Sequence, residues 1–362
     1  MSIYRDSKRI VGTNTERIGA DAISGGWKQV ARTTLSSAGD TVSVTSIPDK
    51  RFYMILSRAL PSGNITQDFR YNNDSSGTNG VNGNYSRRKS TDGGTEGTDI
   101  NQNKHEVSGG ASYPIFSVGY CANKSDQEKL IMTHSFNTQN SAGNANPSTI
   151  QQRIQNVGKW ANTSDAINRI DMINSDSGSY DTDSEVVVLG WDPDDTHTDN
   201  FWEQLASVEL SSAGTEISSG AFTSKKYLWV QVYCLGDGSS DPNGRLQVGS
   251  GSFDAGNNYV ERQATNHNSD GTNGSQDHIP VFSGGRFGNF TNRFIINESG
   301  QEKLFDITGI SSTTEAVTST PNRRMVAGKW SNVSGQIDRI KVYRTANSNY
   351  QAGSFIKVWG AN

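Results

Sequence analysis

Short apolar runs alternate with long polar stretches along the whole chain, a pattern typical of β-strands joined by loops. From Trp27 to Leu35, apolar and polar residues alternate with a period of two, which predicts a half-buried strand. The runs Phe52–Leu56 and Tyr227–Tyr233 are more continuously apolar and predict inner strands. About six to nine short strands are expected in each half of the chain. The best helical candidate, residues 151–157, is short.

The strand pattern of the first half returns in the second half. Each copy contains an opening Trp segment that ends in Ser-Ser-Ala-Gly, a Gln-Glu-Lys-Leu motif and a Gly-Lys-Trp motif. The copies lie at Trp27–Gly39 and Trp202–Gly214, at Gln127–Leu130 and Gln301–Leu304, and at Gly158–Trp160 and Gly328–Trp330. Repeated short strands with turn signals between them predict an all-β protein with two tandem β-sandwich or jelly-roll domains that arose by internal duplication. The tryptophan of each Gly-Lys-Trp motif is expected to plug its core.

The repeat sets the predicted domain boundaries. An N-terminal extended arm covers residues 1–26, the first sandwich 27–190 and the second 202–362, with a linker rich in turn formers at 191–201. The arm has no counterpart in the second half; it either pairs with a neighbouring subunit or lies on the surface.

Composition and charge narrow the classes of function. Hydrophobic residues make up 32% of the chain, which a sandwich tolerates when its apolar positions are correctly phased. The net charge of −4 lacks the excess of positive charge that is typical of nucleic-acid-binding proteins. No apolar run is long enough for membrane insertion, and the opening residues lack the apolar core of a secretory signal. The two cysteines, Cys121 and Cys234, occupy non-equivalent places in the repeats, so no disulfide framework or shared metal site is expected.

One loop resembles part of a calcium site. Asp237, Asp241 and Asn243 place oxygen ligands at near-alternate positions of a turn, the arrangement that can surround a hard cation such as Ca²⁺. The loop lacks the terminal Glu of a helix-loop site, and Pro242 interrupts it. A solvated turn explains the same residues, and no other cofactor is expected.

A second set of candidates could contact host surface glycans, because sugar sites combine aromatic rings with polar side chains. A Tyr, an Arg and an Asp from the first repeat match three residues in the second: Tyr85, Arg88 and Asp92 with Tyr259, Arg262 and Asp270. The matched Arg and Asp residues would also serve as a salt bridge or a turn cap. No catalytic residues are predicted, because the chain has no Gly-x-Ser-x-Gly, His-Glu-x-x-His or P-loop motif. A carboxylate pair brought together from distant strands stays open.

Three segments resemble structural proteins of viruses that infect bacteria and archaea. They are Ser7–Thr13, the Trp-x₇-Leu-x-x-Ala-Gly-Asp segment at Trp27–Asp40, and the closing segment Gly353–Gly360. The resemblance implies a capsid, decoration or tail-associated component that is assembled in the host cytoplasm and located in the virion.

The sequence thus predicts a non-enzymatic virion structural protein that assembles with itself, as a trimer or another symmetric oligomer, and with other virion proteins. A carbohydrate-binding adhesin or receptor-binding protein is the alternative. A jelly-roll polysaccharide hydrolase or lyase is the third hypothesis.

Overall fold

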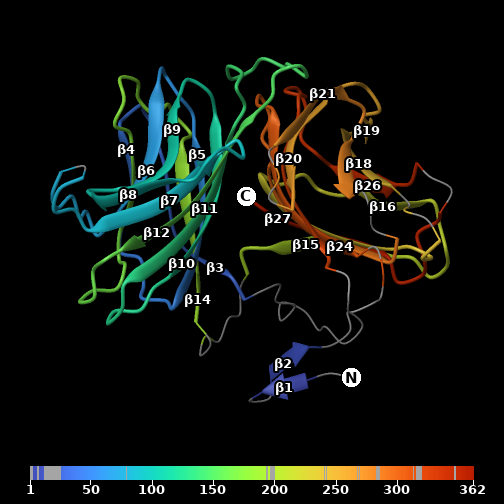
Figure 1. The fold of residues 1–362 in the computed structure, drawn as a ribbon, viewed down its shortest axis with the longest axis horizontal. Coiled ribbons are helices and arrows are strands. Elements are labelled where there is room, and N and C mark those ends of the chain that lie inside the picture. Colours follow the sequence, from blue (N-terminus) through green and yellow to red (C-terminus); the bar gives the residue numbers. More distant parts are fainter. Residues whose placement is uncertain are drawn as a thin grey trace.

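The chain forms two β-sandwiches that stand side by side (Figure 1). This computed structural model describes the backbone of residues 3–5, 8–11 and 282, and the backbone and side chains of residues 26–78, 80–192, 195, 200–239, 241, 243–266, 268, 270–281, 286–312, 314, 320–345 and 348–362. No helix occurs in these ranges, so the all-β prediction is confirmed there.

The first sandwich packs an eight-stranded antiparallel sheet against a four-stranded one. The larger sheet has the order β3 (Lys28–Thr34), β14 (Glu185–Trp191), β5 (Phe52–Ala59), β10 (Ile115–Ala122), β11 (Lys129–Asn137), β12 (Gln152–Trp160), β7 (Tyr85–Thr91) and β8 (Gly97–Gln102). The smaller sheet has the order β4 (Thr41–Val44), β13 (Ile170–Ile173), β6 (Ile65–Tyr71) and β9 (His105–Ala111).

The second sandwich repeats the order of all eight strands of the larger sheet and has one additional short strand in the smaller sheet, so the predicted duplication is confirmed. Its larger sheet has the order β15 (Glu203–Glu209), β27 (Phe355–Ala361), β17 (Tyr227–Leu235), β23 (Gly288–Ile296), β24 (Lys303–Ser312), β25 (Asn322–Trp330), β20 (Tyr259–Thr265) and β21 (Gly271–Gln276). Its smaller sheet contains β16 (Glu216–Ala221), β26 (Arg339–Tyr343), β18 (Gly244–Ser250) and β19 (Ser252–Phe253), with β22 (Ile279–Phe282) also paired to β18.

Within the predicted arm, the described residues form an antiparallel pair of strands, β1 (Ile3–Arg5) and β2 (Lys8–Val11). The other arm residues up to 25 lie outside the described part of the chain, as does most of the predicted linker.

Each Gly-Lys-Trp motif closes one end of a core, as predicted. Trp160 and Trp330 are fully buried, and their indole nitrogens donate to Asp74 Oδ2 and Asp254 Oδ2 at 2.7 and 2.8 Å. The lysine of each Gln-Glu-Lys-Leu motif lies over the neighbouring indole ring, 5.6 Å away in the first sandwich and 5.7 Å in the second. The two motifs therefore recur because each supplies half of one contact.

The short helical candidate at residues 151–157 is not helical, because residues 152–157 belong to strand β12 and Gln151 directly precedes it. β12 is hydrogen-bonded on both sides, to β11 and β7. Its side chains alternate between the two faces of the sheet, and the amide of Asn156 reaches the carbonyl oxygen of Glu106 in the opposite sheet. Pairing on both edges outweighs the weak helical preference of so short a segment.

The glycine of each Gly-Lys-Trp motif makes room for a side chain from the opposite sheet. A Cβ at Gly158 would lie 2.5 Å from Nδ1 of His105, and one at Gly328 would lie 3.0 Å from Cδ1 of Ile279. His105 and Ile279 occupy equivalent positions, so the first sandwich places an imidazole where the second places a hydrocarbon. Burial, followed by the charge of Arg87, lowers the pKa of His105 from 6.5 to about 3.

This depressed pKa predicts a loss of stability in acid. As the pH falls, His105 is protonated in the unfolded chain before it is protonated in the folded protein. Its contribution to the free energy of unfolding is therefore constant above pH about 7. Below the unfolded pKa this contribution decreases, by about 2–3 kcal/mol at pH about 4.5. His105→Ile, which copies the second repeat, should flatten that decline. Urea unfolding of both proteins at neutral and acid pH measures it, and parallel declines would contradict the assignment.

Candidate functional site

The two tyrosines predicted to contact glycans lie inside the cores, 1% and 0% exposed. The hydroxyl of Tyr85 accepts from the backbone nitrogen of Tyr71 at 2.9 Å and donates to the carbonyl oxygen of Asp74 at 3.2 Å. Tyr259 makes the same kind of bonds in the second sandwich. Neither ring has a face open to a ligand, so both are core residues that fasten a loop.

Three of the matched charged residues hold the two sandwiches together. Arg153 of the first sandwich pairs with Asp270 of the second at 2.5 Å, and both side chains are almost fully buried. Arg262 of the second sandwich pairs with Asp92 of the first at 3.2 Å. The salt-bridge alternative for Asp92, Arg262 and Asp270 is therefore confirmed, although the bridges run between the repeats.

The predicted equivalence of Asp92 and Asp270 is wrong, because Asp92 corresponds to Asn266. Both residues have φ near 53°, and their backbone nitrogens donate to the carbonyl oxygens of Arg153 and Arg323 at 2.8 and 2.9 Å. Their side chains accept from the backbone nitrogens of the same two arginines. Asp and Asn share this turn position because both tolerate positive φ.

The predicted equivalence of Arg88 and Arg262 is confirmed by register, since they lie opposite Val157 and Ala327 at matching places on β12 and β25. Arg88 pairs with Glu96 at 2.8 Å on the surface, where both side chains are 58% exposed. This exposed pair contributes little to stability.

In the predicted calcium loop, the two described aspartates accept hydrogen bonds from other groups of the protein. Asp237 Oδ1 accepts from the backbone nitrogen of Ser239 at 2.9 Å and from the hydroxyl of Ser348 at 3.0 Å, while Asp241 Oδ1 accepts from the backbone nitrogen of Asn243 at 2.9 Å. Within the described residues, no group of three or more His, Cys, Asp or Glu side chains is placed to hold a metal ion. Cys121 and Cys234 are buried, unpaired thiols on non-equivalent strands, β10 and β17.

An apolar cluster outside both cores also joins the sandwiches. The outer face of each eight-stranded sheet points away from its small sheet, and parts of the two outer faces pack together. The first sandwich contributes Met54, Leu56, Phe116, Val118, Phe136, Val187 and Leu189, and the second contributes Trp202, Tyr227, Phe294, Ile296, Leu304, Ala327, Trp359 and Ala361. The eight-stranded sheets are thus apolar on both faces.

A buried carboxylate lies at the margin of this contact. Glu185 of the first sandwich is fully buried and receives Lys226 Nζ at 2.5 Å, the hydroxyl of Tyr227, and Arg32 at 2.7 Å. Burial raises its pKa, but Lys226, Tyr227 and Arg32 together lower it from 4.5 to about 2. The carboxylate therefore stays charged and fastens β17 of the second sandwich to β14 of the first.

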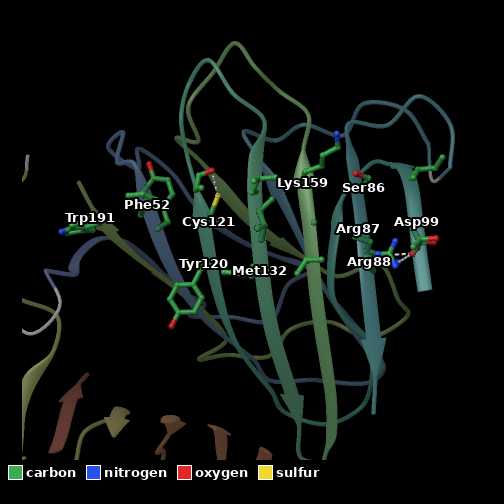
Figure 2. A pocket seen from close by; sticks show the side chains of 18 of the residues that line it. Phe52, Ser86, Arg87, Arg88, Asp99, Tyr120, Cys121, Met132, Lys159 and Trp191 are labelled. Carbon is green, nitrogen blue, oxygen red and sulfur yellow. Dashed lines mark hydrogen bonds and ion pairs between the residues drawn. The ribbon is translucent and has the colours of Figure 1, made fainter. Parts of the chain in front are cut away.

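The rest of the outer face of the first sandwich is open, and forms a concavity of about 900 Å³ (Figure 2). Figure 2 shows Phe52 and Trp191 at one side of this concavity and Asp99 at the other. We call it the open face; its apolar lining comes from Trp27, Phe52, Ile100, Tyr120, Leu130, Met132, Val157 and Trp191. Four of the six exposed large hydrophobic side chains in the described residues belong to it: Ile100, Leu130, Met132 and Val157.

Equivalent positions in the second sandwich are covered. Leu130 is 59% exposed, whereas Leu304, at the same place in the repeated Gln-Glu-Lys-Leu motif, is 2% exposed. The side chain of Lys159 is 41% exposed, whereas that of Lys329 is fully buried. The same surface is therefore an interface in one repeat and free in the other.

The charged groups around the open face already have partners. Arg87 pairs with Asp99 at 2.8 Å and with Glu106 at 2.5 Å, and Lys159 pairs with Glu128 at 2.7 Å. These pairs leave the centre of the face to apolar side chains.

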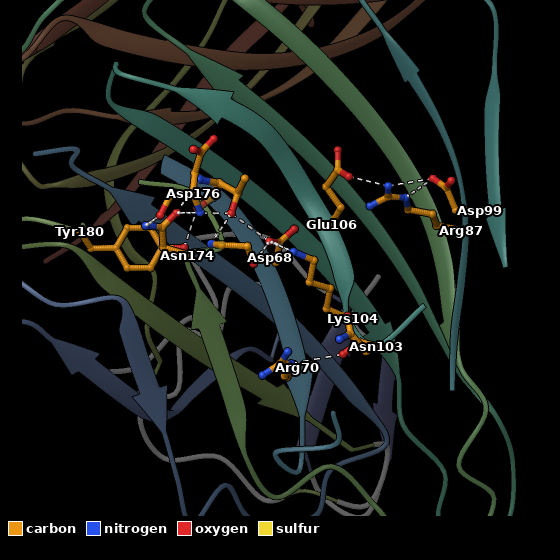
Figure 3. A network of polar contacts seen from close by, with 12 residues as sticks. Asp68, Arg70, Arg87, Asp99, Asn103, Lys104, Glu106, Asn174, Asp176 and Tyr180 are labelled. Atoms are coloured by element: carbon orange, nitrogen blue, oxygen red, sulfur yellow. Dashed lines mark hydrogen bonds and ion pairs between the residues drawn. The ribbon is translucent and has the colours of Figure 1, made fainter. Parts of the chain in front are cut away.

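A separate polar network ties the loop after β13 to the small sheet of the first sandwich (Figure 3). Asp68 on β6 receives Lys104 Nζ at 2.8 Å and the hydroxyl of Ser175 at 3.2 Å. Burial raises the pKa of Asp68, and Lys104 opposes this shift. The hydroxyl of Tyr180 donates to the carbonyl oxygen of Thr66 at 2.7 Å, which fixes the end of the same loop.

Comparison with known proteins gives no family. No family model matches the chain, and no curated protein matches it. Among solved structures, mouse laminin alpha1 chain domains LG4-5 match 93% of this chain and 91% of their own, with 9% identity and a TM-score of 0.20. The LG1-3 region of the laminin alpha2 chain matches 91% of this chain and 62% of its own, with 8% identity and a TM-score of 0.20. At such scores we draw no argument from either likeness.

Among the described residues, no helix has the length and apolar character needed to cross a membrane.

Equivalent ion pairs in the two repeats predict unequal costs of mutation. Glu302 pairs with the buried Lys329 at 3.1 Å, while Glu128 pairs with the exposed Lys159. Glu302→Gln leaves a buried ammonium without a counter-charge and should cost about 3 kcal/mol of unfolding free energy. Glu128→Gln, the matched control, should cost less than about 1 kcal/mol. Urea unfolding measures both, and equal costs would mean that Lys329 is not buried in solution.

Proposed function

We propose that this protein is a non-enzymatic structural component that assembles in many copies into a larger particle. The observation that supports this proposal is the open face of the first sandwich. The equivalent surface of the second sandwich is buried, because it packs against the first sandwich of the same chain. Large contiguous apolar surfaces on a folded protein mark interaction sites. The partner surface is therefore another protein.

The chemistry of the open face favours a protein partner over a glycan. Ile100, Leu130, Met132 and Val157 offer aliphatic surface without hydrogen-bonding groups. Sugar hydroxyls need polar partners, and Arg87 and Lys159 at the rim are engaged in ion pairs. The buried Tyr85 and Tyr259 also add nothing to an adhesin site.

The particle that we propose is a virion of a virus of bacteria or archaea, with the protein as a capsid, decoration or tail-associated component. This setting rests on the sequence resemblance described above, and tandem β-sandwiches suit a subunit that covers surface. Assembly would take place in the host cytoplasm.

Mutation of the open face should weaken self-association without unfolding the chain. Leu130→Glu with Met132→Glu places two carboxylates on side chains that are 59% and 56% exposed, so the fold should tolerate them while a partner cannot bury them. Sedimentation velocity of the wild type should show species heavier than the 39.3 kDa monomer, and the double variant should shift the distribution to monomer.

Val81→Glu is the matched control, because Val81 is 57% exposed but lies outside the open face. It should assemble like the wild type. A wild type that remains monomeric at about 100 μM, roughly the range where weak specific interfaces are occupied, would contradict assembly through this face. Binding to an immobilised glycan panel by such a monomer would favour the adhesin instead.

A further inference from the structure

The contact between the two sandwiches is asymmetric. We call the end of each eight-stranded sheet that holds Trp160 or Trp330 its Trp end, and the opposite end its far end. Glu185 and Arg58 at the far end of the first sandwich contact Tyr227 and Glu298 at the Trp end of the second, the latter pair at 2.5 Å. Lys329, also at the Trp end of the second sandwich, donates to the carbonyl oxygen of Asn146 beyond the far end of the first at 3.1 Å. At these places the Trp end of the second sandwich lies on the far end of the first, whereas Asp270, beyond the far end of β20, also pairs with Arg153 at the far end of β12.

Two surfaces are left over from this arrangement. One is the open face, which is the Trp end of the first sandwich. The other is the far end of β17, β23, β24 and β27 in the second sandwich, where the outward side chains are half-buried or exposed: Gln231, Tyr233, Phe290, Asn292, Thr308, Ile310, Phe355 and Lys357. A Trp end and a far end, the same two kinds of surface that meet inside the chain, therefore remain free.

We infer that the open face of one copy binds the far end of the second sandwich of another copy, repeating between chains the contact that joins the sandwiches within one chain. This inference rests on the proposed function and names its partner and its surface. A contact between two different surfaces is heterologous, so it generates a closed ring or an open filament of chains.

The residues on the two free surfaces have changed as pairs. Within the chain, Glu185 bonds to Tyr227; by register their counterparts are Phe355 and Phe52, which replace a polar pair by two aromatic rings. Both rings already have aromatic neighbours, since Phe355 lies 5.6 Å from Tyr233 and Phe52 stacks on Trp191 at 5.4 Å.

A second pair follows the same rule. The counterparts of Arg58 and Glu298 are Tyr233 and Lys124, because the β10–β11 and β23–β24 hairpins have equal lengths. An ion pair inside the chain thus becomes a tyrosine and a lysine between chains, which attract one another through the ring face or the hydroxyl. Lys124 also pairs with Asp126 at 2.9 Å, but both side chains are well exposed, so this pair holds the lysine only weakly. Neither of these two pairs between chains, Phe52 with Phe355 and Lys124 with Tyr233, would bring like charges together.

The free far end is also more polar than its counterpart. Leu56, flanked by Val118 and Val187, corresponds to Gln231, which is flanked by Asn292 and Lys357. The apolar pair Phe116–Phe136 is kept as Phe290–Ile310. A surface that keeps an apolar anchor within a polar surround suits a contact that forms between separately folded chains.

Complementation between two blocked variants tests the inference. Leu130→Glu with Met132→Glu blocks the open face, and Ile310→Glu blocks the far end at a side chain that is 48% exposed. Each variant alone should be monomeric in sedimentation velocity. A mixture of the two should form a 1:1 dimer and nothing larger, because only one functional face of each kind remains.

Three outcomes separate this inference from the proposed function. If Ile310→Glu assembles like the wild type while the open-face variant does not, the open face is an interface but its partner is another surface, and the inference is overturned. If the open-face variant also assembles normally, both are overturned. A monomeric wild type overturns both as well.

Cross-linking gives an independent readout of the same contact. Phe52→Cys in one chain and Phe355→Cys in another should be joined by a short bis-maleimide only when the two are mixed, because the native Cys121 and Cys234 are buried. Val81→Cys mixed with Phe355→Cys is the control and should give no product. Equal cross-linking in both mixtures would contradict the contact.

Discussion

The structure depends on one constraint: each eight-stranded sheet is apolar on both faces, and a sheet can cover only one of them with its own small sheet. The inner face is covered by the four strands led by β4 or by the small sheet that contains β16, which gives the two cores. The outer face has to be covered by another body, and for much of its area that body is the other repeat. The tandem arrangement is thus a requirement of the sheets, because a lone sandwich would leave a broad apolar surface in water.

Buried polar groups adapt to this packing. The lysines of the Gln-Glu-Lys-Leu motifs are fully buried, yet carbonyl oxygens accept from their ammonium groups and an indole face lies beside each. Glu185 stays charged because three donors surround it. Each buried charge in these sites is satisfied locally, as the low dielectric of the interior requires.

The sequence was a good guide to the fold and a poor one to the interface. The sequence pattern directly predicted the strands, the core tryptophans and the repeated Gly-Lys-Trp motifs, because the short-range periodicity of apolar residues reflects which side chains are buried. The short segment at 151–157 was the best helical candidate, yet all of it except Gln151 is strand, because tertiary pairing decided its structure. Asp92 was matched to Asp270 because Asp-Gly turns recur in a chain with 38 glycines, and only the register of β7 and β20 shows the true counterpart. The open face could not have been found from its own residues, because Leu130 and Leu304 sit in identical four-residue motifs and differ only in what covers them.

The equal hairpins and the matching strand order imply a single-sandwich ancestor that carried both a Trp end and a far end. Such an ancestor could have buried the apolar outer face of its sheet only by binding another copy of itself. Gene duplication would then have joined two such molecules in one chain. The fused chain would keep one free Trp end, on the first sandwich, and one free far end, on the second.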